Sequence, residues 1–211
     1  MPNRAALADS TARNIVPLQS RAQKTRAALL DAVERIVASE GEAAVTTTRV
    51  AAQTGVSVGA VYRYFPDRDA LLLAAYDATV VRIVEVYGAA LESIPETTPR
   101  DAAARQMLRA YLDAALAIPA HAGLLAAMRH IRPVDADLGA NEGRIADRVL
   151  APFLARFAGP VDAAPERLHF LNVLLGTLVD LYLVTDGEAA RARLLEDIEA
   201  HMLLALERAA G

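Results

Sequence analysis

The segment from Thr46 to Leu72 constrains the fold more than any other part of the chain. The threonines at its start can cap a short helix, because a hydroxyl oxygen accepts hydrogen bonds from the free N–H groups of the first turn. Gly55 offers the left-handed conformation at which many helices end, and Ser57 can cap a second short helix. This pattern predicts a helix-turn-helix, whose second helix enters the major groove of DNA.

The second helix of this pair is expected over about residues 58–64, and it ends in three residues suited to DNA contact. Tyr62 and Tyr64 can hydrogen-bond to phosphates or stack on sugars and bases, and Arg63 can reach a phosphate or a guanine edge. The alternative for the tyrosines is packing against the next helix, which Asp67 can cap.

This segment resembles the TetR family of bacterial transcriptional regulators. The resemblance is carried by residues 46–48, 50–52, 55–65 and 69–72, and the upstream helix from Thr25 to Glu40 fits it as well. The match covers residues 21–76 or so, and the rest of the chain fits the family only in length and helical character. It implies that DNA is contacted by the residues that match the family's motif, which are Thr47, Thr48, Ser57, Val58, Gly59, Ala60, Tyr62, Arg63, Tyr64 and Arg68.

The periodicity of the whole chain predicts an all-α protein of about nine helices. Apolar residues repeat at three and four positions along the expected helices, proline and glycine mark the joints, and no two-residue period indicates a strand. We expect a flexible arm over residues 1–20, a three-helix domain over 21–66 and a larger helical domain over 67–211, which a long helix at about 67–93 connects to the first. The later helices are expected at about 99–118, 121–131, 138–158, 163–186 and 187–209.

Charge is distributed unevenly along the chain. The net charge of −4 by itself argues against a nucleic-acid partner. Residues 1–70, however, hold nine Lys+Arg and seven Asp+Glu, whereas the remainder holds 13 and 19. Such an asymmetry is expected when one end of a molecule meets phosphate.

Several classes of protein are disfavoured by what the sequence lacks. It has no cysteine, which excludes disulfides and thiolate metal sites, and its four histidines do not cluster. No apolar run suits a signal peptide, and the most apolar window, residues 168–184, is too polar for a membrane span. No nucleophile–base pair stands out. We therefore expect a cytoplasmic protein that is not an enzyme and needs no metal or cofactor.

The expected helix over residues 163–186 carries a polar and small stripe. Its members are separated by three and four positions and so share one face: His169, Asn172, Gly176 and Asp180. This stripe can be a subunit interface or the polar lining of a ligand pocket. Because the resemblance implies dimerisation through the last two helices, we assign His169, Gly176 and Asp180 to a dimer interface.

A ligand pocket is expected among the middle helices. Its candidate lining residues are Met107, Leu108, Tyr111, Leu125, Met128, Arg129 and Asn172. The alternative for the apolar ones is ordinary core, and Arg129 near a helix end can offset the helix dipole without any ligand.

Together with the resemblance, these patterns predict a homodimeric regulator that binds a palindromic double-stranded DNA operator. It would be a repressor, and a small apolar or aromatic molecule bound in the larger domain would release it from the operator. The alternatives are a helical protein-interaction module, a regulator with no small-molecule effector and, in a different class, an enzyme in the larger domain.

Overall fold

The computed structural model describes residues 15–132, 146–157 and 165–210. These residues form nine α-helices, a short 3-10 helix and a π-helix, without a strand among them, so the all-α prediction is confirmed. The bounds are α1 Ile15–Glu40, η1 Glu42–Ala44, α2 Thr47–Thr54, α3 Val58–Tyr62, α4 Arg68–Ser93, α5 Arg100–Leu116, α6 His121–Ile131, η2 Ala146–Leu150, α8 Ala151–Phe157, α9 Pro165–Val184 and α10 Glu188–Ala210.

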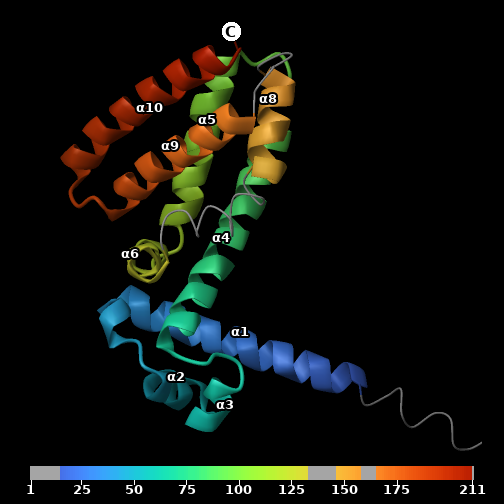
Figure 1. The fold of residues 1–211 in the computed structure, drawn as a ribbon, viewed down its shortest axis with the longest axis vertical. Coiled ribbons are helices and arrows are strands. Elements are labelled where there is room, and N and C mark those ends of the chain that lie inside the picture. Colours follow the sequence, from blue (N-terminus) through green and yellow to red (C-terminus); the bar gives the residue numbers. More distant parts are fainter. Residues whose placement is uncertain (1–14, 133–145, 158–164, 211) are drawn as a thin grey trace, which may run out of the picture.

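The helices are arranged in two groups along one long helix (Figure 1). Helices α1, α2 and α3 gather at the N-terminal end of α4, and α5 and η2 pack against its other half. Helices α9 and α10 pack on α5 and on each other, and α8 contacts η2. Helix α6 lies between the two groups and contacts α1, α4 and α9. Helix α4 therefore belongs to both halves of the molecule, as the sequence predicts for the connecting helix.

Two helix ends differ from the sequence-based expectation. Helix α1 begins at Ile15 rather than near Arg21, so part of the expected arm is helical; the rest of the arm, residues 1–14, lies outside the described residues. Helix α3 ends at Tyr62 rather than Tyr64. The N–H groups of Tyr64 and Phe65 both donate to the carbonyl oxygen of Val61, at 2.9 and 3.0 Å, and this turn closes the helix before the proline.

The remaining helices largely keep their expected places. The helix expected over 138–158 corresponds to η2 and α8, and residues 133–145 and 158–164 lie outside the described part of the chain. Within the described ranges, no single helix has the length and hydropathy of a membrane span. Helices α5 and α6 reach that hydropathy only together, and they are bent by 92° where they meet.

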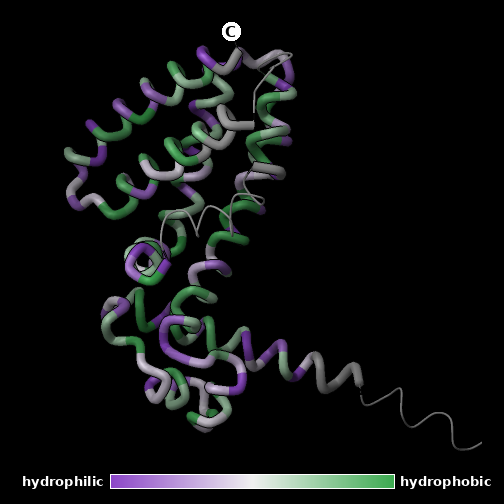
Figure 2. Tube along the Cα trace, viewed as in Figure 1, coloured by the Kyte–Doolittle hydropathy of each residue, from purple (hydrophilic) through white to green (hydrophobic). Residues whose placement is uncertain are grey.

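One apolar core runs through both groups of helices. Hydrophobic and hydrophilic residues alternate along α4, α5, α9 and α10, which Figure 2 shows as changes of colour along each tube. Much of the apolar surface of these helices meets neighbouring helices, as amphipathic helices require. Among the fully buried side chains are Leu29 and Ile36 of α1, Leu71 and Ile83 of α4, and Leu124 of α6.

Candidate nucleic-acid interface and ligand pocket

Side-chain caps define the two short helices of the helix-turn-helix. The Thr46 hydroxyl oxygen accepts a hydrogen bond from the backbone N–H of Arg49 at 3.1 Å, and the Ser57 hydroxyl oxygen accepts one from Ala60 at the same distance. Between them Gly55 has φ 70°, which is the left-handed conformation that glycine adopts without strain. The turn chemistry predicted from the sequence is confirmed at all three positions.

The end of α3 presents two of its three predicted DNA-contacting side chains to solvent. Tyr62 is 51% exposed and Arg63 is also exposed. The hydroxyl of Tyr62 lies 3.3 Å from that of Thr47, so that contact links α3 to α2. Tyr64 is partly buried against the core, whereas Val61 and Phe65 lie inside it as expected. Tyr62 and Arg63 are therefore the accessible pair.

The other predicted DNA contacts likewise include both exposed and half-buried residues. Thr48, Ser57 and Gly59 are exposed, whereas Thr47, Val58 and Ala60 are half-buried, and Val58 packs against the core. A Cβ atom added to Gly59 would meet no atom within 4 Å. The surface around the start of α3 is therefore open to an approaching partner.

Arg68 has partners that the sequence did not indicate. Its Nε donates to the carbonyl oxygen of Val45 at 2.9 Å, and its Nη2 donates to the carbonyl oxygen of Glu42 at 2.7 Å. These bonds attach the start of α4 to the loop before α2. A phosphate contact from Arg68 stays a prediction, and Nη1, which lies 3.5 Å from the Asp69 carboxylate, is the group left to make it.

A buried polar contact lies where α6 meets α4. His121, which is 2% exposed, places its Nδ1 2.7 Å from the hydroxyl oxygen of Thr79, and its ring stacks on Tyr76. The Thr79 hydroxyl donates its one hydrogen to the carbonyl oxygen of Tyr76, at 2.7 Å, which assigns the proton of the ring to Nδ1. Burial, and secondarily the charge of Arg82, lower the pKa of His121 from 6.5 to about 4.

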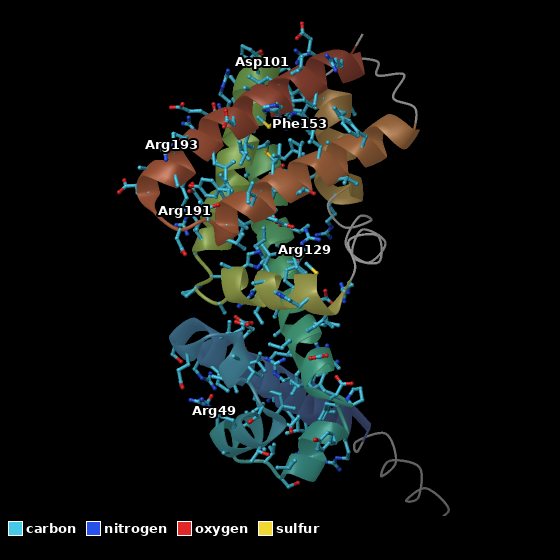
Figure 3. The ribbon with its side chains drawn as sticks, turned by 60° about the vertical axis from the view of Figure 1, so that its left-hand side comes forward. Arg49, Asp101, Arg129, Phe153, Arg191 and Arg193 are labelled. Atoms are coloured by element: carbon cyan, nitrogen blue, oxygen red, sulfur yellow. The ribbon has the colours of Figure 1, made fainter. Side chains whose placement is uncertain are left out.

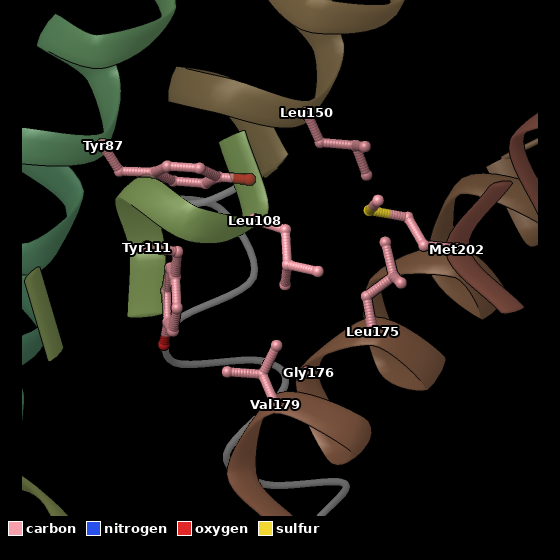
Figure 4. A pocket seen from close by; sticks show the side chains of 8 residues that line it. All are labelled: Tyr87, Leu108, Tyr111, Leu150, Leu175, Gly176, Val179 and Met202. Carbon is pink, nitrogen blue, oxygen red and sulfur yellow. The ribbon is translucent and has the colours of Figure 1, made fainter. Parts of the chain in front are cut away.

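The larger group of helices borders a partly open cavity of about 100 Å³ (Figure 4). Helices α4, α5, α9 and α10 and the π-helix η2 contribute its lining, which comprises Tyr87, Leu108, Tyr111, Leu150, Leu175, Gly176, Val179 and Met202. The rings of Tyr87 and Tyr111 meet edge to face, with their centroids 5.5 Å apart. Burial raises the pKa of the Tyr87 hydroxyl to about 12. The cavity is therefore apolar, with phenol groups along one side.

Only part of the predicted ligand-binding set lines this cavity. Leu108 and Tyr111 do, but Met107, Leu125 and Met128 are buried in the core instead, because their faces of α5 and α6 pack on neighbouring helices. Arg129, which Figure 3 labels, forms an ion pair with Asp180 of α9. The side chain of Asn172 lies outside the described residues. The ligand-binding role of the predicted residues stays a prediction.

Two members of the polar stripe of α9 can be placed in the structure. Gly176 is exposed and also lines the cavity, whereas Asp180 is partly buried and pairs with Arg129 of α6. The side chain of His169 lies outside the described residues. A different set of α9 residues is exposed, namely Phe170, Leu181 and Val184, at 60, 50 and 47%. These three, which we call the outer α9 face, share one side of the helix. The assignment of His169, Gly176 and Asp180 to a subunit interface stays a prediction.

The described residues combine a helix-turn-helix, whose second helix is exposed, with a long helix and an all-helical group that lines an apolar cavity. This arrangement fits the class of helical DNA-binding proteins. Residues 29–75 match the model for "Bacterial regulatory proteins, tetR family". This match confirms the resemblance that the sequence shows over these residues. No functionally curated protein matches the sequence significantly.

Solved structures extend the similarity to the whole fold. A TetR family transcription regulator from Marinobacter aquaeolei VT8 is 21% identical, with TM-score 0.57, and the match covers 91% of this chain and 96% of that one. The TetR family repressor AlkX from Dietzia sp. is 18% identical, with TM-score 0.59, and the match covers 88% and 97%. The TetR-like regulator LfrR from Mycobacterium smegmatis, solved with proflavine, is 23% identical, with TM-score 0.52 and the same coverage. The chain thus has the fold of TetR family regulators.

Proposed function

We propose that the protein is a cytoplasmic transcriptional repressor that binds a palindromic DNA operator as a homodimer and leaves it when a small molecule occupies the cavity. The observation that carries the DNA-binding part is the exposed end of α3, where Tyr62 and Arg63 face solvent beside an uncrowded Gly59. In a dimer, two such helices would read half-sites about one helical turn, ~34–36 Å, apart.

The DNA-binding surface can be tested with glycine and arginine variants. Gly59→Ala should keep the fold, because the added methyl meets no protein atom within 4 Å, yet it should weaken operator binding if the DNA backbone approaches α3 closely. Gly88→Ala, on α4 and equally uncrowded, is the matched control. If Arg63 contacts a guanine, Arg63→Ala should weaken operator binding by about 1–3 kcal/mol and relax the base preference. If Arg63 binds a phosphate instead, the variant should lower the slope of log affinity against log salt concentration by about one.

Fluorescence anisotropy with DNA from beside the protein's own gene would supply the readout, at several salt concentrations. We expect sequence-selective binding by the wild type and by Gly88→Ala, and weaker binding by Gly59→Ala and Arg63→Ala. Equal binding by all four proteins would assign α3 a purely structural role and favour the protein-interaction alternative.

The outer α9 face supports the dimer. Phe170, Leu181 and Val184 lie exposed on α9, and Leu204 of the neighbouring α10 is 46% exposed. Adjacent exposed apolar side chains of this kind mark interaction surfaces. Val184→Arg should shift the protein toward monomer in sedimentation equilibrium, whereas Val86→Arg, at a similarly exposed valine of α4, should not. If neither variant changed the mass, the outer α9 face would not be the interface.

Helix α4 supports the coupling between ligand and operator. It contributes Tyr87 to the cavity, and at its other end Arg68 is hydrogen-bonded to the loop before α2. A ligand that alters the position of α4 would thus alter the position of the helix-turn-helix. It can do so only if it binds the DNA-incompetent arrangement more tightly. LfrR, solved with proflavine, shows that a protein of this fold can bind a small molecule.

A further inference from the structure

The lining of the cavity disfavours a charged ligand. None of its described residues carries a side chain that is charged at neutral pH. The nearby guanidinium of Arg129 is already paired with the carboxylate of Asp180, so neither group is offered to a ligand. Moving an ion from water into such a site without a partner costs several kcal/mol. A neutral ligand avoids that cost.

The Tyr87 hydroxyl is the distinctive polar group of the cavity. Figure 4 shows it pointing between Leu108 and Leu150, whereas the hydroxyl of Tyr111 points away from Leu150 and Met202. No described residue hydrogen-bonds to the Tyr87 hydroxyl, although Tyr87 is part of an apolar wall. A hydroxyl that faces apolar side chains without a partner forgoes hydrogen bonds that it would make in water. A ligand with an oxygen at this place would restore one of them.

The size of the cavity sets the size of its ligand. Its volume of about 100 Å³ is somewhat below the ~150 Å³ of an engineered apolar cavity that binds benzene. One six-membered ring with a small substituent is therefore near the limit before the helices have to move. The edge-to-face pair of Tyr87 and Tyr111 favours an aromatic ring, since such rings prefer offset or edge contacts with their neighbours.

We propose that the cavity selects an uncharged molecule of about one aromatic ring that carries a hydroxyl or carbonyl oxygen, and that this oxygen accepts a hydrogen bond from the Tyr87 hydroxyl. The inference rests on the proposed function, in which the cavity receives the effector, and it specifies the effector's class. The group that discriminates among neutral ligands is the phenol of Tyr87. The rest of the lining provides shape and excludes charge.

The first experiment uses four probes of nearly equal size: p-cresol, toluene, benzoate and benzylamine. Their binding to the full-length protein without DNA is measured by isothermal titration calorimetry at pH 7.5. We expect p-cresol to bind more tightly than toluene and the two ions to show no saturable binding. Benzoate or benzylamine binding as tightly as p-cresol would overturn the proposal, and so would no binding by any probe.

The second experiment isolates the hydrogen bond. Tyr87→Phe should weaken p-cresol binding roughly five- to twentyfold, the range for one neutral hydrogen bond lost from a buried site, while toluene binding stays within about twofold. Tyr111→Phe removes the same atom from the ring whose hydroxyl points away, and it should change both ligands equally. An equal loss of p-cresol and toluene in Tyr87→Phe would show that the hydroxyl does not discriminate between them.

A third variant locates the binding. Leucine at Gly176 should fill the cavity and abolish p-cresol binding, whereas Gly88→Leu, outside the lining, should not; neither Cβ position meets an atom within 4 Å. Unchanged p-cresol binding in Gly176→Leu would place the ligand elsewhere. Operator binding is measured separately, without probes. A protein that binds the operator selectively but binds no probe would refute the proposed ligand class alone. A protein that binds p-cresol but shows no selective operator binding would refute the proposed regulator alone.

Discussion

Acid is expected to destabilise the protein through His121. This imidazole lies at the contact of α6 with α4, where its neutral ring hydrogen-bonds to Thr79 and stacks on Tyr76. Its protonation would place a cation in a buried site near the Arg82 guanidinium, and for those two reasons its pKa is lowered from 6.5 to about 4. The unfolded chain therefore binds the proton more readily than the folded protein does.

The size of the effect follows from that difference. Between pH 6.5 and about 4 the unfolded state carries more protons, so the free energy of unfolding falls as pH falls through this window. One pKa unit corresponds to about 1.4 kcal/mol, which gives about 3 kcal/mol for the whole window. This is a large fraction of the roughly 5–15 kcal/mol that holds a typical domain folded.

Urea unfolding at a fixed protein concentration, followed by circular dichroism between pH 7.5 and 4.5, would measure this loss. Carboxylates titrate in the same range, so the informative quantity is the difference between the wild type and His121→Gln, whose amide stays neutral. We expect the wild type to lose about 2–3 kcal/mol more than the variant by pH 4.5. His201→Gln, at an exposed histidine of α10, is the control and should follow the wild type. Parallel curves for the wild type and His121→Gln would refute the reasoning.

Three further predictions concern packing and polar contacts. Gly123→Ala should destabilise the protein by about 1–2 kcal/mol, because the added Cβ would lie 2.7 Å from Cγ1 of Val37, whose branched side chain is stiff. Gly88→Ala, where the added Cβ meets no atom within 4 Å, should stabilise the protein slightly, and thermal unfolding compares the two variants. Arg156→Met should cost about 1–3 kcal/mol in urea unfolding, since Arg156 donates to the carbonyl oxygens of Leu91 and Ile94 at the end of α4. Tyr87→Phe should leave the free energy of unfolding unchanged or raise it by ~1 kcal/mol, because it removes an unpartnered hydroxyl, and a clear loss would mean that the hydroxyl has a partner.

The features that the sequence predicted are those set by neighbours along the chain. Thr46, Gly55, Ser57 and Asp67 act at helix ends through bonds to residues three or four positions away, so spacing and side-chain type identify them. Helix periodicity likewise located most of α4, α5, α6, α9 and α10. In these places local and tertiary preferences agree.

The cavity could not be located in this way, because five elements distant in sequence line it. The sequence marks Tyr87 and Met202 only as residues on apolar helix faces, and no periodicity distinguishes core from cavity lining. Gly176, which the sequence assigns to a subunit interface, also borders the cavity in the structure. Arg68 and Arg129 show a related limit of sequence-based prediction. Their partners, the Val45 carbonyl and the Asp180 carboxylate, lie far away in the sequence and become evident only in the packed structure.

Helix α4 is fastened at both of its ends, by the guanidinium of Arg68 at the first turn and by that of Arg156 at the last carbonyls. Its 26 residues correspond to ~39 Å at 1.5 Å per residue, so a tilt of about 5° at one end displaces the other by roughly 3 Å. That is close to the rise of one base pair. In the dimer that we propose, a movement at Tyr87 too small to disturb the packing of the core would therefore suffice to shift the two α3 helices out of register with the grooves of a DNA duplex.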